Sequence, residues 1–368
     1  MIEFIIEVLR GWGVNFGFFR LVDYVTFRFI ISIITSIIFV VLFGHRIIVE
    51  LYEKGFRDAG ESYASIDISS KKGTPTAGGL IFILATSFSS LIWAKWNNAF
   101  VELLFLGFIY FGMIGMLDDY LKVRFKSSLF GLSEKVKGLL QLLFIVPFSF
   151  FLFSDLSPIP HFVRLKFYIP FVKNPIFELN YFLYVAFGIF VLFSIVNAVN
   201  LTDGLDGLAT GTSIPVCAVY MGFSYIMGNK ILAPHFLFPH INGLGEVTVF
   251  LGALVGGLFG FLWFNTYPAE IFMGDTGSLS IGIVLGMVAF FTKQEMLFPI
   301  VGGIFVITIF TSLLQEKVGM KIGRRIFTRA PIHHAFILRG IAEPKLVVRY
   351  WIISIFLALI AALSIKLR

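Results

Sequence analysis

Long apolar segments follow one another along the chain, and short polar stretches separate them. A helix needs about 20 mostly apolar residues to cross a bilayer, and in hydrocarbon its backbone groups must be satisfied internally. The pattern therefore predicts about ten membrane-spanning helices with no soluble domain between them. Their expected limits are residues 21–44, 79–96, 100–117, 138–154, 181–199, 207–227, 247–266, 278–293, 297–316 and 347–366.

Two further segments have a different pattern. Residues 155–180 contain four prolines and short β-type pieces, which predicts an extramembrane loop with a small hairpin. Residues 1–18 carry Glu3 and Glu7 without a basic leader, so we expect an amphipathic helix at the interface rather than a cleavable signal peptide. No repeat divides the chain, and residues 1–368 are interpreted as a single domain, an all-α polytopic membrane protein.

The composition agrees with this fold class. The chain is 58% hydrophobic and 14% charged, whereas a soluble domain is nearer half apolar and a quarter charged. The single cysteine, Cys217, excludes an intrachain disulfide and a thiolate metal site. The net charge of +7 is compatible with an anionic substrate. Nucleic-acid binding is disfavoured, because no basic soluble domain with aromatic residues remains to do it.

The distribution of lysine and arginine predicts the orientation. These residues concentrate in loops within 46–72, 122–137 and 321–345, and they are sparser in the loops between. Because short cytoplasmic loops carry the excess of lysine and arginine, we expect the first set to be cytoplasmic. With ten spans, both termini would then be periplasmic.

Five polar motifs fall at the cytoplasmic ends of the expected spans. They are KKGTPTAGG (71–79), DDYLK (118–122), NAVNLTDGLDGL (197–208), FMGDTGS (272–278) and APIHHAF (330–336). Each has an ordinary explanation by itself, such as a span-end ion pair, a helix cap, a turn or a loop histidine. Their convergence on one face favours a functional site there.

The DDYLK motif places two acids side by side. Asp118 and Lys122 are four residues apart and share a helix face, while Asp119 points about a quarter turn away. Adjacent carboxylates repel each other unless a cation or a partner lies between them. This motif therefore indicates a cation site or a site of charge-dependent chemistry.

The other motifs add oxygen and nitrogen ligands of the same kind. Acids and amides recur every third residue on one helical face, at Asn197, Asn200, Asp203 and Asp206. Asp275 lies in a glycine-bounded turn whose backbone N–H groups can face a phosphate. Such acids, without thiolates, fit Mg²⁺ held together with substrate phosphates.

The basic and imidazole side chains fit an anionic substrate. Lys71 and Thr76 offer a cation and a hydroxyl to a pyrophosphate. His333 and His334 are adjacent, and adjacent histidines on a helix chelate one metal poorly, so phosphate contact or proton transfer suits them better.

The motifs resemble those of the polyprenyl-phosphate sugar-1-phosphate transferase superfamily over nearly the whole chain. DDYLK is similar to its DDxxK motif, and NAVNLTDGLDGL to its NxxNxxDGxDGL motif. The loop APIHHAF looks closest to the phospho-N-acetylmuramoyl-pentapeptide transferase branch. This branch usually has three histidines followed two residues later by Glu, whereas Ala335 and Ile337 stand at those two positions here.

The resemblance implies an Mg²⁺-dependent transfer of phospho-MurNAc-pentapeptide from UDP-MurNAc-pentapeptide to undecaprenyl phosphate, giving lipid I and UMP. It implies a bacterial cytoplasmic (inner) membrane enzyme, a homodimer, with its active site on the cytoplasmic face. Asp275 would bind the metal, and Asp118 would act as general base toward, or orient, the lipid phosphate, with Asp119 beside it. The diphosphate and metal shell would involve Lys71, Thr76, Asn200, Asp203 and Gln315. The uridine pocket would comprise Gly204, Leu205, Asp206 and Phe272, and the histidine pair would meet the sugar or the pentapeptide.

Alternatives remain open at the level of sequence. A sister transferase that moves GlcNAc-1-phosphate to the same lipid shares the aspartate motifs, and the histidine loop is what separates the two. An ion-coupled transporter would place its ionisable residues at the bilayer midplane, and a non-catalytic scaffold would not need a one-sided, charge-dense site. Transfer in one step and transfer through a covalent carboxylate intermediate are both compatible with these residues.

Overall fold

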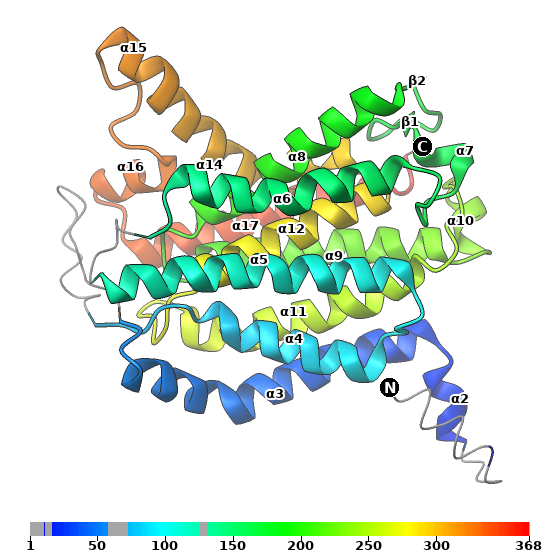
Figure 1. The fold of residues 1–368 in the computed structure, drawn as a ribbon, viewed down its shortest axis with the longest axis horizontal. Helices are drawn as coiled ribbons and strands as arrows, with labels where there is room; N and C mark the ends of the chain where they lie inside the picture. Colours follow the sequence, from blue (N-terminus) through cyan, green and yellow to red (C-terminus); the bar gives the residue numbers. More distant parts are fainter. Residues whose placement is uncertain (1–10, 12–16, 58–72, 126–130, 368) are drawn as a thin grey trace.

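The computed structural model describes residues 11, 17–57, 73–125 and 131–367, and nearly all of its elements are helices (Figure 1). In chain order the α-helices are α2 (Phe18–Val22), α3 (Val25–Glu53), α4 (Gly79–Trp93), α5 (Ala99–Arg124), α6 (Glu134–Phe153), α7 (His161–Arg164), α8 (Tyr181–Thr202), α9 (Leu208–Gly228), α10 (Leu232–His235), α11 (Gly245–Asn265), α12 (Gly274–Phe291), α13 (Phe298–Val301), α14 (Gly303–Leu313), α15 (Met320–Ile322), α16 (Ile332–Leu338) and α17 (Glu343–Leu363). A 3₁₀ turn (Glu295–Leu297) precedes α13, and a π-helical segment (Leu314–Gly319) follows α14.

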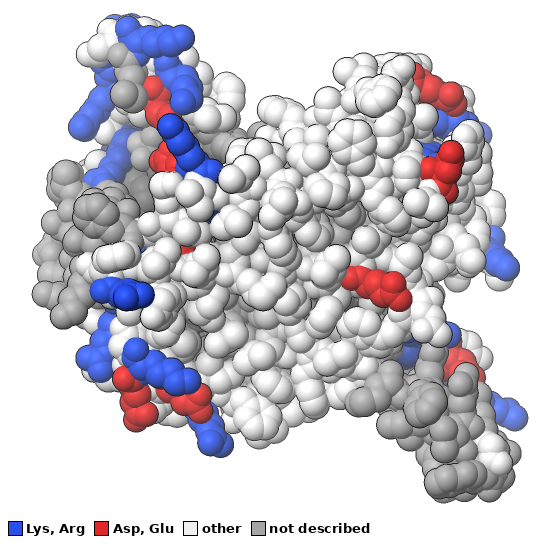
Figure 2. Space-filling view, viewed as in Figure 1, with Lys and Arg blue, Asp and Glu red and all other residues white. Residues whose placement is uncertain are grey.

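The long helices lie along one axis of the molecule, as a membrane bundle requires (Figure 1). Lysine, arginine and acidic residues gather at the two ends, and the surface between them is largely uncharged (Figure 2). Within the described residues, seven helices are long and apolar enough to cross a membrane, and a pair bent by 86° around Gly302 would make an eighth. The chain is therefore a multi-pass membrane protein.

Each of the ten expected spans coincides with a helix or a helix pair. The span expected at 79–96 is a helix of 15 residues, Gly79–Trp93, which is short for a crossing. The span expected at 207–227 forms α9, whose serine and threonine residues make it less apolar than its neighbours. The membrane character of the chain is confirmed, and the number of ten crossings stays a prediction.

The predicted hairpin in the loop 155–180 is confirmed. Strands β1 (Lys166–Phe167) and β2 (Phe177–Glu178) pair antiparallel, with Lys166 opposite Glu178. They lie at the same end of the bundle as α7 and α10 (Figure 1). The interfacial helix expected over 1–18 lies mostly outside the described residues. Within that range the structure describes only residues 11, 17 and 18.

Helix α12 is the centre of the bundle. In its most apolar stretch 89% of the residues are buried, against 22% for α3 at the periphery. Two glycines let neighbouring helices approach its first turn. A Cβ on Gly115 of α5 would lie 2.2 Å from the carbonyl oxygen of Asp275, and one on Gly79 of α4 would lie 2.2 Å from the nitrogen of Gly277. Because of these glycines, the start of α12 lies between α4 and α5 at one end of the bundle.

Candidate active site

Three carboxylates meet where α5 ends and α12 begins. Asp118 and Asp119 occupy the last two turns of α5, and Asp275 lies in the first turn of α12. One oxygen from each of the three lies within 4.8 Å of the others. Residues more than 150 positions apart in sequence therefore form one acidic cluster, as the convergence of the motifs predicted.

Asp119 holds the beginning of α12 in place. Its Oδ1 accepts the backbone N–H of Asp275 at 3.1 Å. Its Oδ2 accepts both the backbone N–H of Thr276 at 3.0 Å and the Thr276 hydroxyl at 2.6 Å. The first N–H groups of a helix have no partner within the helix, so a carboxylate that accepts them fixes its position. Asp119 therefore determines where Asp275 stands.

Two lysines neutralise part of this cluster. Lys122 Nζ lies 2.6 Å from Asp118 Oδ2 and 3.2 Å from Asp275 Oδ2, which confirms the predicted i,i+4 pair on α5. Lys137, near the start of α6, bonds Asp275 and lies 3.4 Å from Asp118. Sequence reasoning counted Lys137 only among the cytoplasmic cations. A signal was present, because Lys137 and the buried Gln141 are polar residues four apart on one helix, and the residues between them are apolar or glycine.

The amides of α8 divide into two groups. Asn200 donates to Asp275 Oδ1 at 2.7 Å and to the Ser278 hydroxyl at 2.9 Å, so it orients the metal-candidate carboxylate. Asn197, one turn earlier, donates to Gln141 Oε1 at 2.8 Å and joins α8 to α6. The predicted helical face holds for Asn197 and Asn200 only, because α8 ends at Thr202 and Asp203 and Asp206 belong to the turn that follows; Asn200 is bonded to the acidic cluster.

Asp203 ends α8 and lies close enough to the cluster for the charges there to affect its carboxyl group. Its burial, and after that the negative charges of Asp275, Asp119 and Asp206, raise the pKa of the Asp203 carboxyl well above its usual range. A cation or a hydrogen-bonding ligand placed near it would lower that pKa again.

The histidine pair faces the turn that joins α8 to α9. A Cβ on Gly204 would lie 2.6 Å from His333 Nε2 and 3.2 Å from His334 Nε2, so only glycine fits against these rings. His333 is buried, and neither of its ring nitrogens has a hydrogen-bond partner among the described residues. Burial, and the neighbouring His334, lower the pKa of His333 to about 3. His333 is therefore neutral at physiological pH when no charged ligand is bound.

The loop before α4 is fastened to the loop before α12. The backbone N–H of Phe272 donates to Pro75 O at 2.8 Å, and Gly78 N–H donates to Phe272 O at 2.8 Å. Thr76, in the same loop, is half-buried, and its N–H donates to Phe56 O at 3.1 Å. Phe272 is half-buried too. Lys71 lies outside the described residues.

Comparison with known proteins covers almost the entire chain. Residues 101–293 match the family described as glycosyl transferase family 4, a range that includes the three clustered aspartates. A phospho-N-acetylmuramoyl-pentapeptide-transferase of Desulfovibrio desulfuricans is 42% identical over 95% of this chain and 96% of its own length. A protein of the same name from Syntrophus aciditrophicus is 43% identical over 96% of this chain and 97% of its own length. Another, from a Geobacter species, is 41% identical over 98% of this chain and 99% of its own length.

The chain belongs to the phospho-N-acetylmuramoyl-pentapeptide-transferase family. The relatives extend over the histidine loop, which lies beyond residues 101–293. In that loop the two residues that differ from the expected family pattern, Ala335 and Ile337, have apolar side chains packed against other residues. Ala335 is buried, and Ile337 packs on a cluster that contains Leu205 and Leu346. Hydrophobic contacts therefore occupy the space of the third imidazole and the acid.

Gln315, another residue implied by family resemblance, has a different setting. It lies in the π-helical segment after α14, and its Oε1 accepts the backbone N–H groups of Ile326 at 3.1 Å and Phe327 at 3.0 Å. π-Helical turns occur often at functional sites. Here the amide fixes the chain that leads to the histidine loop, and its role toward a substrate stays a prediction.

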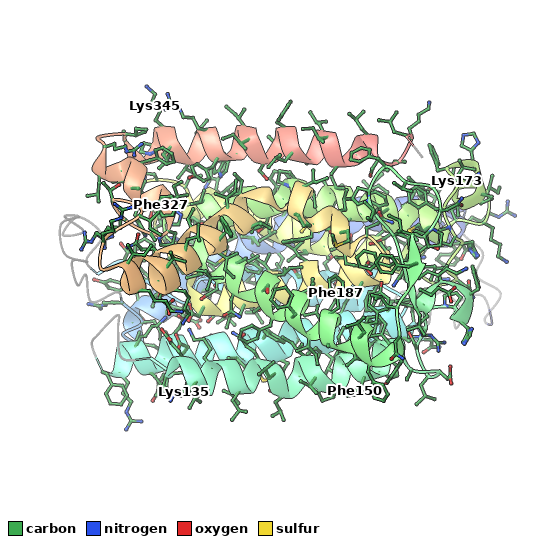
Figure 3. All side chains as sticks on the ribbon, turned by 90° about the horizontal axis from the view of Figure 1, so that it is seen from above. Lys135, Phe150, Lys173, Phe187, Phe327 and Lys345 are labelled. Atoms are coloured by element: carbon green, nitrogen blue, oxygen red, sulfur yellow. The ribbon has the colours of Figure 1, made fainter. Side chains whose placement is uncertain are left out.

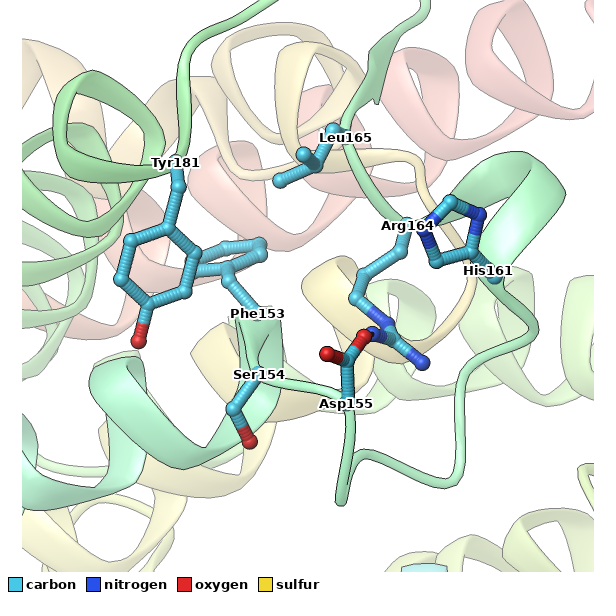
Figure 4. A pocket seen from close by; sticks show the side chains of 7 residues that line it. All are labelled: Phe153, Ser154, Asp155, His161, Arg164, Leu165 and Tyr181. Atoms are coloured by element: carbon cyan, nitrogen blue, oxygen red, sulfur yellow. Dashed lines mark hydrogen bonds and ion pairs between the residues drawn. The ribbon is translucent and has the colours of Figure 1, made fainter.

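A separate cavity of about 280 Å³ lies at the opposite end of the bundle (Figure 4). It is lined by Phe153, Ser154, Asp155, His161, Arg164, Leu165 and Tyr181. Figure 3 shows the two ends from above, with Lys135, Phe327 and Lys345 at one and Phe150 and Lys173 at the other. None of the site residues named above lines this cavity, so it is not part of the candidate active site.

Proposed function

We propose that the protein transfers phospho-MurNAc-pentapeptide from UDP-MurNAc-pentapeptide to undecaprenyl phosphate, releasing UMP and forming lipid I. The observation that carries this proposal is the meeting of Asp118, Asp119 and Asp275 with two lysines at one end of a membrane bundle. Full-length relatives about 42% identical carry the name of that transferase. The concentration of positive charge at this end supports a cytoplasmic site with both termini periplasmic, in the bacterial inner membrane. A homodimer follows from family resemblance.

The donor set supports a magnesium site. The cluster offers only carboxylate oxygens, which Mg²⁺ prefers, and Asp275 presents an oxygen to the same space as Asp118. Both oxygens of Asp119 are held by backbone N–H groups at the start of α12, whereas the partners of Asp275 are side chains, so Asp275, with Asp118 beside it, would hold the ion. A bound Mg²⁺ would supply positive charge to the diphosphate and to the departing UMP.

Positively charged residues of the protein would reduce the repulsion between the two phosphorylated reactants. Lys122 and Lys137 provide fixed positive charge beside Asp275, where charge on the departing UMP can be stabilised. Asp118 orients these lysines and the lipid phosphate. In the one-step route, an oxygen of the lipid phosphate bonds to the phosphorus next to the sugar. The bond from that phosphorus to the oxygen it shares with UMP then breaks, and the electron pair leaves with UMP.

The remaining site residues would position the nucleotide and the sugar. Gly204, Leu205 and Asp206, together with the half-buried ring of Phe272, are the proposed uridine pocket. His333, neutral and buried beside Gly204, is suited to accept or donate one hydrogen bond to the sugar or the pentapeptide.

UMP release tests the proposal. Purified protein in vesicles with undecaprenyl phosphate and Mg²⁺ should release UMP from UDP-MurNAc-pentapeptide, and UDP-GlcNAc should be inert. The converse pattern would assign the sister reaction, and release from neither would refute a transferase of this class. Removal of Mg²⁺ by a chelator should abolish release, and restored Mg²⁺ should recover it.

A further inference from the structure

The turn between α8 and α9 is shaped by elements far away in sequence. It runs from Asp203 to Gly207, which has a φ of +74° and therefore favours glycine. The turn carries the residues proposed for the uridine pocket. Its local backbone hydrogen bonds are few, namely Asp203 N–H to Asn200 O, Gly204 N–H to Thr202 O and Leu208 N–H to Leu205 O. Its shape therefore depends on outside partners.

Glu343 is one such partner. It lies in the first turn of α17, and its Oε1 accepts the backbone N–H of Asp206 at 2.9 Å. On the other side, Asp206 Oδ2 accepts the backbone N–H of Ala269 at 3.1 Å. Asp206 is thus held from two directions, by the C-terminal helix through its backbone and by the segment after α11 through its side chain.

The rest of α17 is packed closely on the helix that follows the turn. Trp351 Nε1 donates to Gly207 O at 3.0 Å, and a Cβ on Gly211 would lie 2.1 Å from the same nitrogen. One turn further on, the Ser354 hydroxyl donates to Thr212 O at 3.0 Å. Because α17 is fixed against α9 in this way, Glu343 reaches the turn from a rigid support.

Glu343 brings a carboxylate oxygen to the backbone of Asp206. A hydrogen bond from an N–H to a charged acceptor is stronger than one between neutral groups, so this contact ties the turn firmly to α17. If the acceptor were removed, the partly buried N–H of Asp206 would lose its partner and the turn would have more freedom.

We propose that Glu343 is a positioning residue for the nucleotide-binding turn, acting through the backbone of Asp206 without touching the reacting groups. That the turn binds a nucleotide rests on the proposed function. That Glu343 holds the turn in its shape rests on the geometry alone. This role predicts a contribution to substrate affinity rather than to the chemical step, since the bond from Glu343 reaches the turn that carries the proposed uridine pocket.

The test compares three variants. In Glu343→Ala, the KM for UDP-MurNAc-pentapeptide and the dissociation constant for UMP should each rise about tenfold, the equivalent of a lost charged hydrogen bond, with kcat within about twofold. Glu343→Gln keeps an acceptor oxygen and should recover most of the affinity. Ser354→Ala removes a hydrogen bond between α17 and α9, further from the turn, and should leave KM unchanged.

A second readout is independent of activity. Amide hydrogen exchange at residues 203–208 should be faster in Glu343→Ala than in the wild type, and unchanged in Ser354→Ala. Unaltered exchange in Glu343→Ala, a fall in kcat without a change in KM, or an equal effect of Ser354→Ala would overturn the role of Glu343. If the wild type bound no UMP, the proposed function would fail, and hydrogen exchange would still decide whether Glu343 holds the turn.

Discussion

Two buried charged clusters lie at opposite ends of the same pair of helices. Helix α12 begins with Asp275 in the acidic cluster, and Lys293 follows its other end. Helix α8 gives Asn200 to the acidic cluster and Tyr184 to the other. In that second cluster, Lys293 Nζ bonds the Tyr184 hydroxyl, Arg164 O at 3.1 Å and Glu295 Oε1 at 3.4 Å. Tyr184 also donates to Glu295.

The clusters differ in charge balance and in access. Lys293 and Glu295 are one cation and one anion, and their side chains are 1% and 0% exposed. The acidic cluster has three carboxylates against two lysines, and Lys122, Lys137 and Asp275 are 30%, 18% and 13% exposed. A balanced, sealed cluster joins helices, whereas an unbalanced and accessible one has capacity for a cation and for charged ligands. Burial of charge alone does not identify an active site.

The largest expected effect comes from Asp275→Asn. The substitution keeps the shape and the Asn200 contact but removes the charge, so UMP release should fall by about 10³-fold. Thermal stability should change little, because Asp118 remains as a partner for both lysines. Turnover and thermal denaturation of the same preparation check both parts. Near-normal turnover with unchanged Mg²⁺ dependence would remove Asp275 from the metal site.

The matching experiment in the sealed cluster is Lys293→Met. It leaves Glu295 as an uncompensated buried charge, so the free energy of unfolding should fall by about 3–5 kcal/mol, with kcat of the folded protein unchanged. Denaturation in detergent measures the stability. The double variant with Glu295→Gln removes both charges and should regain part of the loss. A drop in kcat without a loss of stability would mean that the clusters are not functionally distinct.

The smallest expected effect is a pH dependence from His333. Its pKa is about 3 in the folded protein and 6.5 when unperturbed, so the unfolded chain binds the proton more readily. Its contribution to stability is therefore present above about pH 6.5 and is lost as pH falls toward 3. His333→Asn should flatten this part of the stability curve, and the exposed His161→Asn should not. Identical slopes in all three proteins would show that His333 is not buried neutral.

The limits of sequence reasoning are visible in particular residues. The pair of Asp118 and Lys122 was predictable because both lie on one helix at a spacing of four. The cap that Asp119 provides to α12 was not, because it joins residues 156 and 157 positions apart. Lys137 and Glu343 were also missed as partners, since each reaches its site only through the packing of a separate helix.

The sequence by itself determined that this chain is a helical membrane protein, since the length and apolarity of each span are local properties. It also determined which motifs carry acids, amides and imidazoles, and the family to which they point. Only the tertiary structure decided which groups bond one another. It determined which carboxylate caps a helix, which lysines neutralise the cluster, and which buried charges are balanced. The physical reason is that charge balance and desolvation depend on neighbours from distant helices, and periodicity along the chain contains no record of those neighbours.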